Sequence, residues 1–165
     1  MPKIYLTRKW VIRSRMMSMK TCMFFGHRIV PRIAETNLRK AISRLIEEED
    51  VQLFLVGDKD GFDKMVQRIL EDFKRTFPCI RYGVVVESEH ERERISDFAN
   101  IILPKGLENI PRKDVETYHN RWLVQRSDYA VVYVNKSFGK SAKFMDMAEM
   151  QGLKVINIAK LKPRR

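Results

Sequence analysis

The chain has 165 residues, of which 44% are hydrophobic and 32% charged, and its formal net charge is +11. This length predicts one domain with a substantial core, and the composition is ordinary for a soluble globular protein. No apolar run approaches the ~20 residues that a membrane-spanning helix needs, which argues against a transmembrane protein and predicts no membrane partner. The two cysteines, Cys22 and Cys79, stand in apolar runs without the spacing of metal ligands. We expect both to be small buried residues, in a reducing, cytoplasmic setting.

The positive charge is concentrated at the two ends of the chain. Residues 1–20 hold six basic residues and no acidic one, residues 160–165 hold four basic residues, and residues 21–159 keep the remaining +1. We therefore predict a basic, flexible extension over 1–20, a single domain over 21–159 and a basic tail over 160–165. The extension has the composition of a targeting presequence, but three methionines just before residue 20 favour an upstream start codon. Basic ends hold phosphates without sequence preference, so nucleic-acid binding is a minor alternative rather than the favoured activity.

Apolar runs and helical patterns alternate along residues 21–159. Near-continuous apolar strands between helices predict a parallel sheet covered on both faces. With right-handed crossovers, the predicted fold class is α/β: a Rossmann-like, doubly wound, mainly parallel sheet of five or six strands with helices on both faces. In chain order, the expected elements are a strand at 21–25, a helix at 35–49, a strand at 51–56, a helix at about 62–73, strands at 80–86 and 99–103, a helix at 112–126, a strand at 129–134, a helix at 141–151 and a strand at 154–158.

Polar, glycine-bearing loops follow three of the expected strands. In an open parallel sheet, ligands bind beyond the carboxyl ends of the strands. Glycine lets a backbone approach a ligand closely, and the helix after each loop offers free N–H groups to an anion. This combination suits a phosphorylated, ribose-containing small molecule. The loop residues are Gly26, His27 and Arg28 after the first strand, Gly57, Asp58, Asp60 and Gly61 after the second, and Asn135, Ser137, Gly139, Lys140 and Ser141 after the fifth.

Some of these residues also have a purely structural interpretation. Asp60 and Asp63 have the spacing of a helix N-cap and a first-turn acid, and capping is favoured over ligand contact for this pair. Asp58 is not explained as a cap, and it would face ribose hydroxyls rather than a phosphate. The stretch 138–141 resembles the end of a phosphate-binding P-loop, but Val134 stands where that motif needs glycine, which excludes a P-loop GTPase or ATPase. The isolated histidines predict no metal site, and no cofactor is predicted.

Four segments occur in a distinctive order: F-F-G-H-R (24–28), V-G-D-K-D-G-F-D (56–63), N-R-W-L-V-Q-R-S-D (120–128) and V-I-N-I (155–158). Together they resemble the YpsA-like branch of the SLOG superfamily, which includes the cytokinin-activating LOG phosphoribohydrolases and the DNA-processing protein DprA. The resemblance runs from residue 21 to residue 159. It implies a Rossmann-like fold that binds a nucleotide or nucleotide derivative at the strand ends, in proteins that are enzymes, ligand sensors or of unknown activity.

Carried over residue by residue, the resemblance implies a ligand site built from four segments. Asn120 and Trp122, on the helix before the fifth strand, join the three loops, although core packing is the simpler explanation for the W-L-V run at 122–124. The implied ligand-binding residues are Gly26, His27, Arg28, Gly57, Asp58, Gly61, Asp63, Asn120, Trp122, Gly139, Lys140 and Ser141.

The chain also departs from the family pattern. His119 precedes Asn120 where YpsA-like proteins tend to have arginine, so a cationic contact there is weaker or pH-dependent. LOG enzymes carry a P-G-G-x-G-T-x-x-E run whose glutamate takes part in cleaving the N-glycosidic bond. The corresponding stretch here has no glutamate at the matching place, and Asp146 and Glu149 are expected at the surface or at the edge of the packing. A carboxylate is needed to stabilise the developing charge or to activate water, so strong catalysis is not expected.

The leading hypothesis is therefore a nucleotide-binding protein, a sensor or binding protein rather than an enzyme. The first alternative is a nucleotide N-glycosidase of the phosphoribohydrolase type, with Asp58 as the only well-placed carboxylate. The second alternative is a DprA-like single-stranded nucleic-acid binder that uses the basic ends. The predicted partner is a nucleotide-like small molecule, and a homo-oligomer stays open because SLOG proteins often assemble as dimers or larger.

Overall fold

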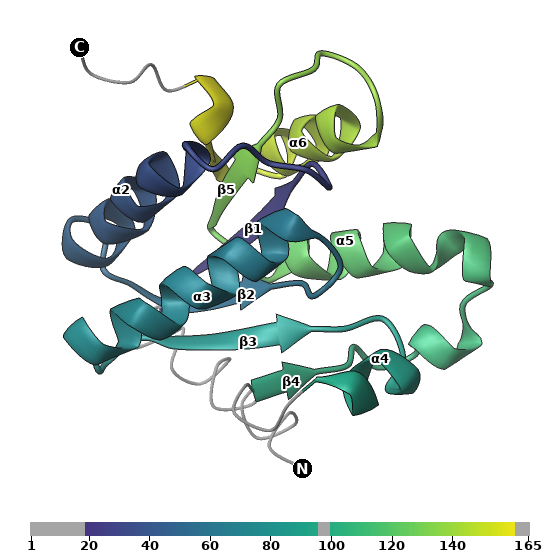
Figure 1. Cartoon of the computed structure of the whole chain (residues 1–165). Helices are drawn as coiled ribbons and strands as arrows, with labels where there is room; N and C mark the ends of the chain where they lie inside the picture. The colour runs from purple at the N-terminus through teal and green to yellow at the C-terminus, as the bar shows by residue number, and fades with distance from the viewer. Residues whose placement is uncertain (1–18, 96–99, 161–165) are drawn as a thin grey trace.

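The computed structural model describes residues 19–95 and 100–160. Within them, six strands form one sheet in the order β4-β3-β2-β1-β5-β6, and every neighbouring pair is parallel (Figure 1). The predicted α/β, Rossmann-like fold class is thus confirmed. The strands are β1 Lys20–Gly26, β2 Val51–Val56, β3 Arg81–Val85, β4 Asn100–Ile102, β5 Tyr129–Tyr133 and β6 Lys154–Asn157.

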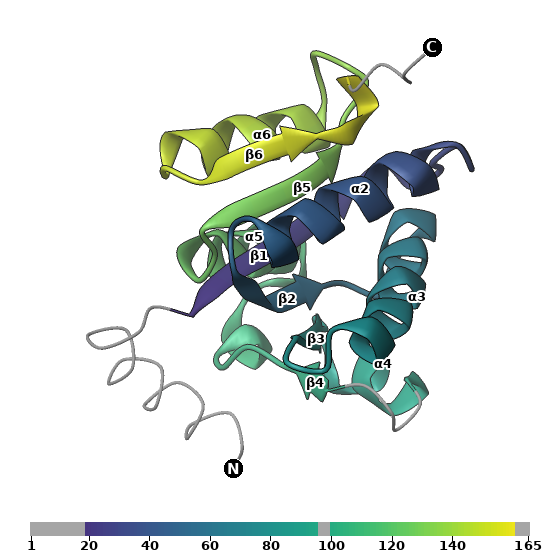
Figure 2. The ribbon, with the colours of Figure 1, turned by 90° about the vertical axis from the view of Figure 1, so that its left-hand side faces the viewer.

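Helices cover both faces of this sheet. Helices α2 (Ala34–Glu47) and α3 (Gly61–Thr76) pack on one face, and α5 (Val115–Gln125) and α6 (Lys140–Met150) pack on the other (Figures 1 and 2). The remaining helical elements are short: α4 Glu89–Arg94, η1 Leu107–Asn109, η2 Arg112–Asp114 and η3 Ile158–Lys160. No helix of the described ranges is long and apolar enough to cross a membrane.

The alternation of side chains along the strands divides the core into two clusters. In β1, Cys22 and Phe24 point toward α2 and α3, whereas Met23 packs in the cluster with α5 and α6. β5 divides in the same way, with Tyr129, Val131 and Tyr133 on the first side. Both faces of these central strands are apolar, which explains why the strands read as continuous hydrophobic runs.

Two expectations from the sequence differ from the structure. Cys22 is buried as predicted, and burial raises the pKa of its thiol, but Cys79 is exposed because it lies in the turn between α3 and β3. The helix expected at 112–126 begins only at Val115, because Pro111 leads into the tighter turn η2. Most of the predicted extension, 1–18, and most of the predicted tail, 161–165, lie outside the described residues.

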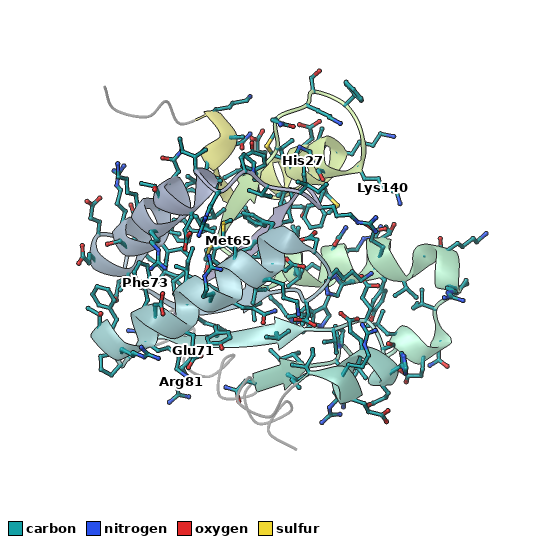
Figure 3. The ribbon with its side chains drawn as sticks, in the orientation of Figure 1. His27, Met65, Glu71, Phe73, Arg81 and Lys140 are labelled. Carbon is teal, nitrogen blue, oxygen red and sulfur yellow. The ribbon has the colours of Figure 1, made fainter. Side chains whose placement is uncertain are left out.

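The direction in which the chain adds strands to the sheet changes at β1. From β1 the chain crosses by α2 to β2, and from β5 it crosses by α6 to β6 in the opposite direction along the sheet. The loops after β1 and β5 therefore leave on opposite faces and open a crevice between them at the carboxyl ends of the strands. The loops stay connected at their start, where the Asn135 backbone N–H donates to His27 Nε2 at 3.0 Å. His27 and Lys140 mark this end of the sheet in Figure 3, with Phe73 and Arg81 at the opposite end.

Asn157 fastens the end of β5 to the end of β6. Its Oδ1 accepts from the backbone N–H groups of Val134 and Ala159 at 3.1 Å each, and its Nδ2 donates to the Val134 carbonyl at 2.8 Å. Both backbone polar groups of the buried Val134 are thus paired by one side chain. This bond set fixes the point at which the chain leaves the sheet for the loop before α6.

We expect Asn157→Ala to lower the free energy of unfolding by about 1–3 kcal/mol, because it leaves buried polar groups of Val134 unpaired. Denaturant unfolding followed by circular dichroism measures this difference. Asn109→Ala, at an exposed position in η1, is the matched control and should change stability little. Equal stability of the two variants would contradict the fastening role of Asn157.

Candidate functional site

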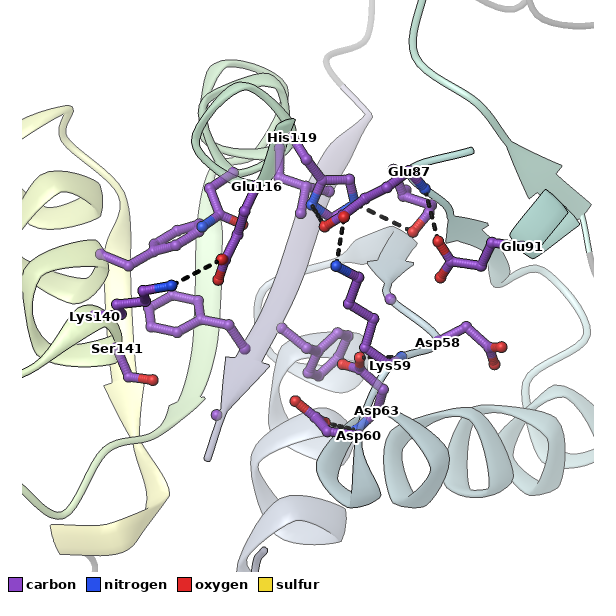
Figure 4. Close-up of a pocket in the computed structure, with 18 residues that line it drawn as sticks. Asp58, Lys59, Asp60, Asp63, Glu87, Glu91, Glu116, His119, Lys140 and Ser141 are labelled. Atoms are coloured by element: carbon purple, nitrogen blue, oxygen red, sulfur yellow. Dashed lines mark hydrogen bonds and ion pairs between the residues drawn. The ribbon is translucent and has the colours of Figure 1, made fainter. Parts of the chain in front are cut away.

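A crevice of about 120 Å³ lies at the carboxyl ends of β1, β2 and β3, between α3 on one side and α5 and α6 on the other (Figure 4). It stands where the strand order reverses, which is the position at which open α/β sheets bind ligands. Its lining combines glycines, carboxylates, two lysines and one histidine. The lining residues are Phe24, Phe25, Gly26, Gly57, Asp58, Lys59, Asp60, Asp63, Val85, Glu87, Glu91, Glu116, His119, Asn120, Leu123, Lys140, Ser141 and Phe144.

The loop between β2 and α3 is built around two carboxylates. Asp60 is the N-cap of α3 and accepts from the Asp63 backbone N–H at 2.9 Å, which confirms the capping interpretation. Asp63 Oδ2 in turn accepts from the Lys59 backbone N–H at 2.9 Å. A Cβ on residue 57 would lie only 2.8 Å from Asp63 Oδ2, so glycine is needed at this position. Gly57 therefore makes room for the carboxylate that holds the loop.

Asp63 is the most strongly perturbed carboxyl group of the crevice. It is buried, and burial together with the neighbouring Asp60 raises its pKa to about 7, although hydrogen bonds from Lys59 and Asp60 oppose the shift. The group thus sits between its charged and neutral forms near neutral pH. A carboxyl group of this kind can donate a proton as well as accept one.

Asp58 is held against the side of α3. Its Oδ1 accepts from Gln67 Nε2 at 2.8 Å and from the Lys64 ammonium, and Gln67 also donates to the Gly57 carbonyl at 2.8 Å. These bonds fix the carboxylate at the edge of the crevice with one oxygen engaged. Asp58 is therefore a positioned acceptor, as a contact to ribose hydroxyls would require.

A chain of polar groups links the ends of β2 and β3 to α5. Glu87, which follows β3, forms an ion pair with the Lys59 ammonium through Oε2, and its Oε1 lies 3.8 Å from His119 Nδ1. His119 Nε2 lies 3.2 Å from the Val85 carbonyl, and because a carbonyl only accepts, Nε2 carries the proton. Glu91 accepts from the Glu87 backbone N–H at 3.0 Å. Figure 4 shows this group on one side of the crevice.

The opposite side of the crevice is the start of α6. Gly139 is its N-cap, with φ of 96° and no side-chain cap bond, so no side chain of the cap residue pairs with the first N–H groups of the helix. Lys140 and Ser141 follow at once, and Lys140 Nζ pairs with Glu116 of α5 at 3.3 Å. The Lys140 side chain is 88% exposed and free to turn toward an anion in the mouth of the crevice.

Carboxylates outnumber cations in this lining. Among the described residues that line the crevice, six carry carboxyl groups and two are lysines, and both lysines pair with crevice glutamates. The expectation that Asp58 is the only well-placed carboxylate is therefore wrong, because Glu87 and Glu116 lie in the same crevice. Glu87 is not predicted as a site residue, because the loop after the third strand has no glycine, whereas glycines mark the loops after the first, second and fifth strands. A signal was present: Ser88 and Glu91 have the spacing of a capping box directly after a predicted strand, and Ser88 caps α4.

Seven of the twelve predicted site residues line the crevice, and five do not. Trp122 packs beside the core and stacks on Arg126, whose guanidinium lies 4.1 Å from the ring centroid. Arg28 has an exposed side chain, and its carbonyl accepts from the Gly61 N–H at 3.2 Å. His27 bridges to Asn135 as described above, and Gly139 stands at the helix start. The seven that line the crevice are Gly26, Gly57, Asp58, Asp63, Asn120, Lys140 and Ser141.

Within residues 19–95 and 100–160, no group of three or more histidine, cysteine, aspartate or glutamate residues is arranged to hold a metal ion. The crevice carboxylates are instead engaged by backbone N–H groups, lysines and Gln67. The side chains of the described crevice offer hydrogen bonding, ion pairing and proton transfer.

The raised pKa of Asp63 predicts a specific pH dependence of stability. Its pKa moves from 3.8 to about 7 on folding, so the native state keeps the proton longer and stability is lost as pH rises from about 4 to about 7. We expect Asp63→Asn to lack this loss, so its stability relative to wild type should rise by up to about 1.4 kcal/mol per pH unit. Denaturant unfolding of both proteins across this range measures the slope.

Asp72→Asn, on the same helix, serves as a contrast. The hydrogen bond with Arg39 lowers the pKa of the Asp72 carboxyl. This ion pair therefore stabilises the fold at pH values above the unfolded-state pKa, and the stabilisation is lost only as pH falls. If the free energies of unfolding of Asp63→Asn and wild type differ by the same amount at every pH, the buried, partly protonated state of Asp63 is contradicted.

No protein-family model matches the chain, and no curated protein matches it. Among solved structures, the chain is similar to the X-ray structure of DNA processing protein A (DprA) from Streptococcus pneumoniae, with a TM-score of 0.60 and 14% sequence identity. The alignment covers 83% of this chain and 49% of that protein, so the chain spans about half its length. At this identity the similarity shows the fold. The Rossmann-like fold implied by the SLOG resemblance is thus shared with DprA, and the YpsA-like branch stays a prediction.

Proposed function

We propose that this protein belongs to the SLOG superfamily and binds a nucleotide or nucleotide-derived small molecule in the crevice, as a sensor or binding protein without strong catalysis. One observation carries the proposal. Seven predicted ligand-binding residues, drawn from four segments up to 115 positions apart, line one crevice at the reversal point of the sheet. Ligand binding at this point of an open α/β sheet is the general rule for such folds.

The two sides of the crevice suggest an orientation for the ligand. The uncapped start of α6, with Lys140 and Ser141, suits a phosphate, because free N–H groups and the helix dipole favour an anion. Asp58, on the opposite side, suits ribose hydroxyls, which donate to carboxylates. The cavity of about 120 Å³ is smaller than the roughly 300–1,000 Å³ of most ligand pockets, so part of the nucleotide would lie over the rim.

The phosphate side is tested with Lys140→Gln, using AMP and adenosine as ligands. We expect the variant to bind AMP about tenfold more weakly than wild type, since a charged contact to the phosphate is lost, and to bind adenosine unchanged. Isothermal titration calorimetry at fixed ionic strength measures both affinities. Thermal shift gives an independent check, because ligand at about 100 times its Kd stabilises the fold by roughly 2.7 kcal/mol.

Lys143→Gln is the matched control, because Lys143 is an exposed lysine on the same helix that does not line the crevice. It removes the same charge three residues away and should leave AMP binding unchanged. Equal losses in the two variants would indicate a diffuse electrostatic effect and count against a phosphate site at the start of α6. Failure of AMP, adenosine and related nucleotides to bind wild type would overturn the proposed function itself.

Cleavage of a nucleotide N-glycosidic bond is the second candidate function. The observation in its favour is that Glu87, with a side chain only 13% exposed, and the partly protonated Asp63 both line the crevice. Such a reaction needs a carboxylate near the sugar and a group that protonates the leaving base. These two residues supply the acid and base character that the LOG-type motif lacks in this chain.

If the protein is such a hydrolase, Glu87→Gln should lower turnover by at least about a hundredfold, because a catalytic carboxylate is removed. Incubation of AMP and GMP with the protein, followed by chromatography for free base, measures the reaction. Glu89→Gln, at an exposed position two residues away, should retain full turnover. Binding without any free base would instead support the sensor.

Nucleic-acid binding remains the third candidate, carried by the fold shared with a DNA-processing protein and by the basic ends of the chain. The excess of carboxylates makes the crevice itself a poor path for a polyphosphate strand. A short single-stranded oligonucleotide in the same titrations distinguishes this candidate. The affinity for this oligonucleotide would fall steeply with salt and with removal of residues 1–18 and 160–165.

A further inference from the structure

We propose that anion binding in the crevice is coupled to a proton on His119, because His119 and Lys59 face the two oxygens of the same carboxylate, Glu87. When His119 takes up its second proton, it pairs with Oε1 of Glu87. The attraction between Glu87 and Lys59, which contacts Oε2, then weakens, and Lys59 can turn to an anionic ligand. The identity of the ligand rests on the proposed function. The exchange of partners rests only on the geometry of the three side chains.

The first element of the argument is the fixed orientation of His119. His119 stands on α5 with its side chain buried, and its Nε2 lies 3.2 Å from the Val85 carbonyl. Nε2 therefore holds a proton in both charge states, and the second proton can only go to Nδ1. Nδ1 lies 3.8 Å from Glu87 Oε1, too far for a hydrogen bond but close enough for one after a small movement.

The second element is the divided role of Glu87. While His119 is neutral, its Nδ1 is an acceptor facing a carboxylate, so it offers Glu87 nothing and Lys59 is the cation that pairs with it. The Glu87 side chain is only 13% exposed, and a poorly hydrated carboxylate needs a cationic partner. The Lys59 side chain is 52% exposed and does not depend on Glu87 in the same way.

Protonation of His119 changes this balance. The new Nδ1–H can donate to Glu87 Oε1, so the carboxylate gains a buried cationic partner beside it. The attraction between Glu87 and Lys59 weakens, and the net charge of the crevice rises by one. Lys59 lies in the loop after β2 and lines the crevice, so its ammonium then attracts an anionic ligand from the side opposite the start of α6. Anion binding is therefore stronger at low pH.

Other titratable groups surround His119 and contribute to the same field. Glu116 stands on its own helix and Lys140 on α6, and these two pair with each other. Glu91 of α4 accepts from the backbone of Glu87. Asp63 of α3 also lines the crevice and changes charge near neutral pH, so its titration must be separated from that of His119.

The exchange of partners is tested first without a ligand, by NMR. The wild-type Lys59 side-chain nitrogen shift should follow the titration of His119, whose ring signals are assigned by comparing His119→Gln with wild type. In His119→Gln the Lys59 shift should no longer change over the pH range in which His119 titrates in wild type. His90→Gln, at an exposed position, is the matched control and should retain it, and Asp63→Asn should retain it as well. A Lys59 shift that ignores His119 in wild type overturns the proposal.

The second measurement is the affinity for AMP at about pH 5.5 and about pH 8, a range in which histidine changes charge. We expect wild type to bind about tenfold more tightly at the lower pH, as one added charge contact implies. Both His119→Gln and Lys59→Met should reduce this ratio to that set by the protonation of AMP and of Asp63. Lys143→Gln should keep the full ratio.

The two measurements separate the possible failures. If AMP binds equally at both pH values, or if Lys59→Met keeps the ratio, the proton coupling is wrong while the binding function stands. If AMP does not bind at either pH but Lys59 follows His119 by NMR, the exchange of partners holds and the proposed ligand class is wrong. Loss of the Lys59 response in Asp63→Asn would assign the titration to Asp63 and overturn the role of His119.

Discussion

The parallel pairing of β1 with both β2 and β5 is the constraint on which the rest of this structure depends. Because the chain leaves β1 toward one face and β5 toward the other, the two loops cannot pack over the ends of their strands. The hydrogen bond between the Asn135 N–H and His27 holds their starting points together, and beyond it they diverge. The crevice is thus a result of topology, and its chemistry comes from the side chains that border it.

Those side chains have two tasks. Asp60, Asp63 and Glu91 accept backbone N–H bonds that start α3 and α4, so they would be present in this form without any ligand. They also give the crevice its negative character, which the lysines offset only in part because each is already paired. A ligand must therefore compete with existing ion pairs. This competition favours a ligand with few charges and makes binding sensitive to the protons that the crevice holds.

The fold could be predicted from the sequence because its central strands are buried on both faces and helices α2 and α3 carry clear apolar stripes. Helix α4 was missed because its six residues are too few for a periodic pattern, and Cys79 was misplaced because an apolar run continued across a turn. The loops of the site could be located from their glycines and polar residues. The ion pairs could not, since Lys59 and Glu87 or Glu116 and Lys140 meet only when separate elements pack together. Trp122 was implied as a ligand-binding residue by the family motif, but it packs beside the core and does not line the crevice.

The contact between Gly57 and Asp63 has a consequence for how this sequence can vary. Because Asp63 Oδ2 occupies the space that a side chain at 57 would need, a change at position 57 alone meets the carboxylate, whereas a change of Asp63 to a smaller residue removes the obstacle. The two positions are therefore epistatic: the order in which substitutions arrive decides which are tolerated. A lineage that first lost Asp63 would be free to lose Gly57, and the mouth of the crevice would then be rebuilt from two positions at once.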